Sequence, residues 1–240
     1  PSIDVRLFSD IHLEVDKNFS IPDVKKNQVI ILAGDIGKQG RSNKLNEMLE
    51  NFFLDILQHE AILIFVAGNH EYWGSYLPRV NDLLKEFESK HDNFYFLNDE
   101  SIVINDVEFI GGTLWTDFNN KDTLTYLEIG GSREYGGKTG NTSNDYHKIK
   151  KKVFDNGRFN YSKITTKDTL ELHEKTVDYI KSRVGKHHTQ FVITHFDPSE
   201  LFLDKEKGVG VTKHGYKYEI NKYAYYSELE YLAENFDYWA

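Results

Sequence analysis

The chain has 240 residues, a formal net charge of −9 and no cysteine. Without cysteine, disulfides, thiolate metal sites and a cysteine nucleophile are excluded. No apolar run approaches the roughly 20 residues that span a bilayer, and no signal-like segment opens the chain, so we expect a soluble, cytoplasmic protein. The acidic balance disfavours a broad nucleic-acid interface. Lysines do gather at Lys148, Lys150, Lys151 and Lys152, which we interpret as a solvated face.

The first half of the chain alternates predicted strands and helices. The apolar strands are Ile3–Phe8, Val29–Ala33 and Ile62–Ala67, and the helices, with apolar residues at helical spacing, are Asn43–His59 and Tyr76–Lys90. This alternation indicates parallel pairing of the strands. Short apolar segments broken by Asn and Asp follow, and they predict a hairpin-rich antiparallel part at Phe94–Leu97, Ile102–Ile104 and Val107–Ile110.

The second half begins with a glycine-rich and aromatic segment at about 111–166 that has little clear periodicity. Long segments of this kind often carry function, and we expect a loop-rich cap on the substrate side. After it we predict, in order, a helix at Asp168–Val184, a strand at Gln190–Thr194, a helix at Ser227–Asn235 and a strand that opens at Asp237. We expect residues 1–240 to form one domain.

Polar side chains follow the predicted core strands, each just beyond the point where the strand ends. They are Asp10 and His12, then Asp35 after Gly34, then Gly68 to Glu71, then His195. Open α/β sheets place their ligand crevice at the carboxyl ends of the strands. A single such residue usually belongs to a turn or caps a helix. Here all four strands are followed by oxygen or imidazole groups, which indicates a shared metal site.

Two divalent ions about 3.5 to 4 Å apart need a bridging carboxylate, further carboxylate and imidazole ligands, and open positions for water and substrate. Asp10 and His12 are two residues apart and can turn toward one ion. We predict that Asp35 bridges the two ions, and that Asn69 and His195 bind the second. A water held between the ions would become a hydroxide that attacks phosphorus.

His70, next to Asn69, is predicted to face the substrate. There it would donate a proton to the leaving oxygen or stabilise charge on the phosphoryl group, so we take His70 and Asp35 as the catalytic residues. A neighbouring carboxylate would orient the imidazole, and Glu71 and Asp35 are both candidates.

These motifs, in this order, resemble the calcineurin-like metallophosphoesterase superfamily. Stretches at 111–118, 144–150, 168–180 and 192–199 further resemble a bacterial and phage branch. The resemblance implies an α/β fold with a two-sheet β-sandwich flanked by helices in four layers, α/β/β/α. It also implies a dinuclear centre with the same ligands: Asp10 and His12 on one metal, Asp35 between the two, and Asn69 and His195 on the other. Mn, Fe, Zn or Ni would suit these ligands, and we favour Mn.

The sequence departs from this resemblance in two places. The family's final Gly-His-x-His block, which supplies one more ligand to each metal, is absent from the 240 residues, and we expect that the chain is a shortened version. Relatives in the branch have two histidines where this chain has His195 and Phe196, so we expect a contact to the site or the substrate to be lost.

The predicted function is a metal-dependent phosphohydrolase that cleaves a phosphomonoester or phosphodiester by attack of a metal-bridging hydroxide. The alternatives are a nuclease on the same dinuclear core and a catalytically weak remnant that binds metal or phosphate. The expected substrate is a phosphorylated small molecule, a nucleotide or a phosphoprotein. Nucleic acid is disfavoured by the acidic charge, and no membrane partner is expected.

Overall fold

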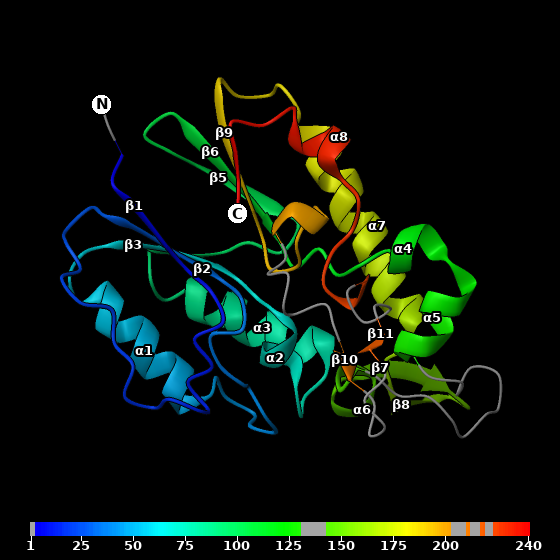
Figure 1. Cartoon of the computed structure of the whole chain (residues 1–240). Coiled ribbons are helices and arrows are strands. Elements are labelled where there is room, and N and C mark those ends of the chain that lie inside the picture. The colour runs from blue at the N-terminus through cyan, green and yellow to red at the C-terminus, as the bar shows by residue number, and fades with distance from the viewer. Residues whose placement is uncertain (1–2, 131–142, 203–209, 212–216, 219–222) are drawn as a thin grey trace.

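The computed structural model describes residues 3–130, 143–202, 210–211, 217–218 and 223–240. Figure 1 shows the elements in chain order. The strands are β1 (Val5–Phe8), β2 (Val29–Ala33), β3 (Ile62–Val66), β4 (Phe94–Phe96), β5 (Glu100–Ile104), β6 (Val107–Gly112), β7 (Lys150–Asp155), β8 (Arg158–Lys163), β9 (Thr189–Thr194), β10 (Gly210–Val211), β11 (Lys217–Tyr218) and β12 (Tyr238–Trp239). The helices are α1 (Glu47–Leu57), α2 (Asn69–Tyr72), α3 (Leu77–Glu88), α4 (Phe118–Lys121), α5 (Thr123–Gly130), α6 (Asp145–Lys148), α7 (Thr166–Arg183) and α8 (Glu230–Ala233), with a 3-10 turn at Glu200–Phe202.

The first sheet has the order β1-β2-β3-β4, and every pair in it is parallel. Strand β2, with the sequence VIILA, is buried along its whole length because it is covered on both faces. Uninterrupted apolar strands of this kind are typical of parallel sheets that are covered on both sides. Parallel pairing brings the carboxyl ends of β1, β2 and β3 to one edge of the sheet.

The second sheet has the order β12-β9-β6-β5 and is mixed. Strands β5 and β6 form an antiparallel hairpin, while β6 with β9 and β9 with β12 are parallel. The predicted strand that opens at Asp237 is confirmed as β12, and the backbone N–H of Thr194 donates to the carbonyl of Ala240 over 2.7 Å. Thr194 directly precedes His195, so the end of β12 lies beside a predicted site residue.

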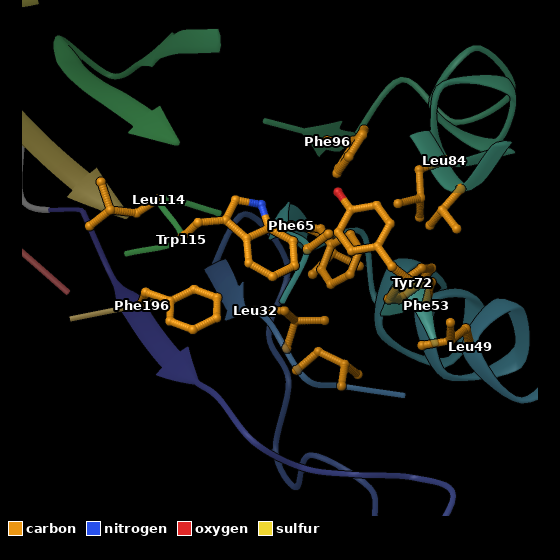
Figure 2. Close-up of a cluster of buried hydrophobic side chains, with 14 of the residues drawn as sticks. Leu32, Leu49, Phe53, Phe65, Tyr72, Leu84, Phe96, Leu114, Trp115 and Phe196 are labelled. Atoms are coloured by element: carbon orange, nitrogen blue, oxygen red, sulfur yellow. The ribbon is translucent and has the colours of Figure 1, made fainter. Parts of the chain in front are cut away.

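The core lies in two parts. Between the sheets, alternate residues of β2 and β3 pack with β6 and β9: Val29, Ile31, Ala33, Ile64, Val66, Phe109 and Ile193, with Leu97 and Ile104. The other faces of the same strands pack against helices, where Leu32 and Phe65 meet Leu49 and Phe53 of α1 (Figure 2). Helices α1 and α3 cover the first sheet and α7 covers the second. The predicted fold class, an α/β fold with two sheets flanked by helices, is confirmed.

Three expectations about elements are corrected. Strand β4 is not part of an antiparallel hairpin, because it pairs in parallel with β3 and extends the first sheet. The segment at about 111–166 is richer in regular structure than its irregular pattern suggested, since it includes α4, α5, α6 and the β7–β8 ribbon; its residues 131–142 lie outside the described residues. Helix α8 is a single turn, Glu230–Ala233, and is shorter than the predicted Ser227–Asn235; the N–H groups of Ala233 and Glu234 make its four-residue hydrogen bonds, to Leu229 and Glu230, while Asn235 and Phe236 bond back over three residues.

In the described part of the chain, no helix combines the length and the apolar character needed to cross a membrane.

Candidate metal centre

The segments that leave the core strands are held against one another by backbone hydrogen bonds. After β1, the N–H of Asp10 donates to the carbonyl of Gly34 over 3.1 Å, and the N–H of His12 donates to the carbonyl of Asp35 over 2.9 Å. The loop after β1 is therefore aligned with the loop after β2. Helix α2 starts directly after β3 and brings Asn69 and His70 to the same edge.

The backbone at this edge is bent into conformations that folding alone does not favour. Asp10, His12 and Asp35 have φ values of 54°, 52° and 53°, in the left-handed region. Non-glycine residues there cost free energy, and such positions cluster at functional sites. Gly34 has a φ of 88°, and a Cβ on it would lie 2.5 Å from Nδ1 of His195. Gly68 is equally constrained, because a Cβ there would collide with Oδ1 of Asp35.

The Asp35 carboxylate lies at the centre of the cluster, and its side chain is 6% exposed. Its Oδ2 is 3.9 Å from Nε2 of His12 and 3.8 Å from Nε2 of His70. Its Oδ1 is 3.4 Å from Nε2 of His195 and accepts the backbone N–H of His70 over 2.8 Å. Each oxygen of this carboxylate therefore faces a different set of imidazoles.

The outer members of the cluster are Asp10 and Asn69. Oδ1 of Asp10 is 3.8 Å from Nε2 of His12, on the more open side of the cluster. Oδ1 of Asn69 is 3.1 Å from Nε2 of His195, whose Nδ1 is 3.0 Å from the carbonyl of Ala33. The structure thus brings together all the sequence-predicted ligands, with Asp35 in the middle.

The orientation of the Asn69 amide is set by Asp145 of α6, which the sequence did not single out. Oδ1 of Asp145 accepts Nδ2 of Asn69 over 2.8 Å and Nε1 of Trp73 over 2.7 Å. Because the amide nitrogen is engaged there, the amide oxygen points at His195. The signal available in the sequence was the stretch 144–150, whose resemblance to the bacterial and phage branch came without a role.

His70 is held by a carboxylate that the sequence reasoning missed. Nδ1 of His70 is 2.8 Å from Oε1 of Glu14, and Nδ1 of His12 is 3.5 Å from the same oxygen. Of the two candidates named from the sequence, Glu71 binds backbone N–H groups instead, and Asp35 faces the other ring nitrogen, Nε2. Glu14 lies two residues after His12 in the loop that leaves β1, so its position on the same extended segment was the available signal.

Glu71 instead holds the loops of the cluster in place. It is fully buried, and its carboxylate accepts the backbone N–H groups of Asp35, Ile36, Gly37 and Gly68 at 2.6 to 3.0 Å. Burial, together with the nearby Asp35 carboxylate, raises the pKa of Glu71 to about 7, against the opposing effect of these hydrogen bonds.

Charge in the cluster also shifts the pKa values of His195 and Glu14. For His195, burial opposes protonation, but the carboxylates of Asp35, Asp10 and Glu71 outweigh it and raise the imidazole pKa. For Glu14, burial likewise opposes ionisation, but the hydrogen bond from His70 and the charges of His70 and His12 lower the carboxyl pKa. A concentration of buried acids and imidazoles in mutual contact is characteristic of functional sites.

These donors fit a divalent cation. His12, Asp35 and His70 each offer one atom, and these atoms lie within 4.8 Å of one another. Imidazole, carboxylate and amide oxygen are ligands for divalent first-row metals. In addition, Oε2 of Glu14 is buried without a hydrogen-bond partner. The group of His12, Asp35 and His70 differs from the predicted set of ligands. It contains His70, which we assigned to catalysis, and it does not include Asp10, Asn69 or His195.

Phe196, where the sequence resemblance implied the loss of a contact to the site or the substrate, is part of the core. Its side chain is buried, and its ring stacks on Trp115 with 5.3 Å between the centroids. Figure 2 shows the two rings side by side, with Tyr72 beyond them. Both Phe196 and Trp115 therefore contribute to the packing of the core.

No protein-family model matches the chain. A relative in Acanthamoeba polyphaga mimivirus, the uncharacterized protein L509, is 30% identical over 242 residues, which cover 94% of this chain and 78% of L509. The chain belongs to the L509 family.

Among solved structures, the chain is similar to a Staphylococcus aureus protein named as a candidate 5'-nucleotidase, in complex with alpha-ketoglutarate. The sequence identity is 15% and the TM-score is 0.43. The match covers 99% of this chain, which spans 44% of the length of that structure.

Proposed function

We propose that this member of the L509 family is a metal-dependent phosphohydrolase that cleaves a phosphomonoester or phosphodiester. The observation that supports the proposal is the Asp35 carboxylate, which has Oδ2 near His12 and His70 and Oδ1 near His195. A buried carboxylate between two sets of nitrogen donors is the arrangement that a bridging ligand requires. Asp10 and His12 would complete one position, and Asn69 and His195 the other.

Two divalent cations, for which Mn is our first choice, would supply Lewis acidity toward the phosphoryl oxygens and lower the pKa of a water ligand. The residues of the chain fix where those cations bind. Asp145 holds the Asn69 amide with its oxygen toward His195, and Glu71 holds the loop that carries Asp35. Partners of this kind orient metal ligands and are needed for tight binding.

His70 is proposed as the proton donor. In hydrolysis the oxygen of water bonds to phosphorus, the ester P–O bond breaks, and the leaving oxygen takes up a proton. Glu14 binds Nδ1 of His70, so Nε2 is the nitrogen that can carry a proton to the leaving oxygen. Stacking of the His70 ring on Trp73, with 3.5 Å between centroids, fixes the plane in which that nitrogen points.

The proposal is tested with purified protein, p-nitrophenyl phosphate and bis(p-nitrophenyl) phosphate, after loading with Mn²⁺, Zn²⁺, Fe²⁺ or Ni²⁺ in turn. We expect metal-dependent release of nitrophenolate from at least one ester. Asp35→Asn should lower kcat/KM by about a thousandfold or more, because it removes the charge of the bridging ligand. Asp178→Asn, an exposed carboxylate on α7, is the matched control and should retain full activity.

Calorimetric metal titration separates an enzyme from a remnant that only binds. Two sites in the starting protein, weakened together by Asp35→Asn, support a dinuclear centre. No hydrolysis of either ester with any metal, despite bound metal, would contradict the phosphohydrolase and favour the binding remnant.

A further inference from the structure

The outward face of the β7–β8 ribbon carries only lysines and aromatic rings. In the antiparallel register, Lys150 pairs with Lys163, Lys152 with Tyr161 and Phe154 with Phe159. The rings of Phe154, Phe159 and Tyr161 are 66%, 62% and 54% exposed. The intervening residues of the ribbon face the other way, so no acidic side chain lies on these three pairs in a chain whose net charge is −9.

The rings and lysines on this face contact one another. Nζ of Lys152 lies 4.1 Å from the centroid of the Phe159 ring, and the Phe154 and Phe159 rings meet edge to face at 5.1 Å. In the described part of the chain, neither Lys150 nor Lys152 forms an ion pair with a carboxylate. Their charges are therefore available to a ligand.

The ribbon is connected to the metal centre by a chain of contacts. Tyr76 bridges to Lys150, and its ring lies 4.8 Å from that of Tyr161. On the other side of this bridge, the N–H of Gly74 donates to the carbonyl of Lys148 over 2.9 Å. Figure 1 shows the ribbon and α6 on the side of the molecule where α2 lies.

The last step reaches His70 itself. Nζ of Lys148 lies 3.5 Å from the centroid of the Trp73 ring. Trp73 in turn stacks on the ring of His70. We call the series Trp73, Lys148, Tyr161, Lys152, Phe159 and Phe154 the aromatic–lysine track. The contacts lead from the proposed proton donor through Trp73 to Lys148, then along the backbone and through the Tyr76 ring to Tyr161, and across the paired strands to the tip of the ribbon.

We propose that the aromatic–lysine track binds a single-stranded polynucleotide and leads its backbone to the metal centre. This inference rests on the proposed function and narrows it to phosphodiesters of nucleic acid. Exposed rings stack on unpaired bases of any sequence, and lysines bind the phosphates between them. The net negative charge of the chain repels the ligand elsewhere, so binding is confined to the track and depends strongly on salt.

The same features disfavour other partners. A duplex hides the faces of its bases, so the exposed rings would have nothing to stack on. The track also has too few lysines to neutralise the many phosphates that a duplex-binding surface contacts. A lipid surface would engage the phenylalanines at the ribbon tip but would leave Trp73 and Lys148, beside the metal centre, without a role.

The test is binding of a fluorescein-labelled single strand of about twelve nucleotides, of the length that such surfaces accommodate. Fluorescence anisotropy is measured in EDTA, so that no turnover occurs, with oligothymidylate and oligouridylate in parallel. Phe154→Ala and Phe159→Ala should each weaken binding by about tenfold or more. Lys152→Gln should make the log–log salt dependence shallower by about 0.7.

The matched control is a second cation–ring pair, remote from the track. Lys181 lies 5.9 Å from the ring of Tyr231, which is also exposed. Lys181→Gln and Tyr231→Ala should leave binding unchanged. Circular dichroism and thermal unfolding of each variant show whether the ribbon is intact, and Lys152→Gln, which keeps the rings, tests the track even if a phenylalanine variant unfolds.

Hydrolysis of bis(p-nitrophenyl) phosphate separates this inference from the proposed function. We expect Phe154→Ala, Phe159→Ala and Lys152→Gln to hydrolyse this small ester at the normal rate while they lose binding and cleavage of the oligonucleotide. Normal ester hydrolysis with no oligonucleotide binding at low salt would contradict the proposed role of the track but not the proposed phosphohydrolase. Oligonucleotide binding without hydrolysis of any ester overturns the phosphohydrolase instead.

Two further outcomes would also overturn the track. One is equal loss of binding in the control and track variants. The other is that the phenylalanine variants lose co-sedimentation with phosphatidylserine vesicles but keep the oligonucleotide, which would assign the ribbon to a lipid surface.

Discussion

The interior between the two sheets and the carboxyl ends of the same strands are built in opposite ways. Between the sheets, β2 and β3 contribute side chains such as Val29, Ile31 and Ile64, which are fully buried and apolar. A few residues further along, the chain buries Asp35 and Glu71 beside one another and adopts left-handed φ values. The first region stabilises the fold by removing apolar surface from water, whereas the second carries charge and strain at a cost in stability.

This contrast teaches that the strand ends are selected for something other than stability. Buried like charges and strained backbone persist only where the surrounding structure holds them. Here the rigid parallel sheet and the hydrogen bonds of Glu71 provide that support. Substitutions in the interior should therefore affect stability alone, and substitutions at the ends should affect chemistry alone, with Glu71 as the exception.

Glu71→Ala should have the largest effect, because it leaves four buried N–H groups without an acceptor. At about 1 to 3 kcal/mol for each unsatisfied group, we expect a loss of about 4 kcal/mol or more in the free energy of unfolding. Urea unfolding measures it, with Glu71→Gln as the variant that keeps the shape and one acceptor. A loss below about 1 kcal/mol would show that Glu71 does not hold the loops.

Ile31→Ala should lower the free energy of unfolding by about 2 to 5 kcal/mol, because it opens a cavity between the sheets. Ester hydrolysis per folded molecule should not change. Leu7→Ala is the matched control, since Leu7 pairs with Ile31 in the sheet but is 45% exposed, and it should cost about 1 kcal/mol or less. Equal costs for the two variants would contradict the assignment of Ile31 to the interior.

Glu14→Gln should lower ester hydrolysis by about tenfold to a hundredfold, because the neutral amide binds Nδ1 of His70 more weakly and orients the ring less well. The free energy of unfolding should change by less than about 0.5 kcal/mol. Asp16→Asn, an exposed carboxylate in the same loop, should leave the rate unchanged. If the pH profile of kcat were identical in Glu14→Gln and the starting protein, Glu14 would not act through His70.

The smallest expected effect is the pH dependence that His173 contributes. His173 is a buried residue of α7, and its Nδ1 lies 3.0 Å from the carbonyl oxygen of Leu114. Burial lowers the pKa of this imidazole. The unfolded chain then binds the proton more readily than the folded one, so this contribution to stability is present above about pH 6.5 and is lost as the pH falls below it. Unfolding free energies of the starting protein and His173→Gln, measured from pH 8 to 5, should therefore converge at low pH.

Periodicity in the sequence predicted the strands of the first sheet and helices α1, α3 and α7 within a few residues, because continuous apolar runs and helical spacing reflect burial directly. It did not predict that β4 joins the first sheet, since a strand of three residues carries no information on its partner. The β7–β8 ribbon was missed because its alternate residues are lysines and exposed rings rather than apolar and polar ones. The organisation of residues 1–240 as one domain stays a prediction.

The sequence by itself determined which residues follow the core strands, because strand ends can be read from apolar runs, and parallel pairing then placed Asp10, Asp35 and Asn69 at one edge of the first sheet. The packing of the two sheets, which the sequence does not specify, brings His195 at the end of β9 to the same place. Only the tertiary structure decided which groups touch. Glu14 rather than Glu71 binds His70, Asp145 turns the Asn69 amide, and Phe196 packs into the core. Contacts of this kind depend on backbone bends and side-chain directions in loops, where local sequence imposes no period.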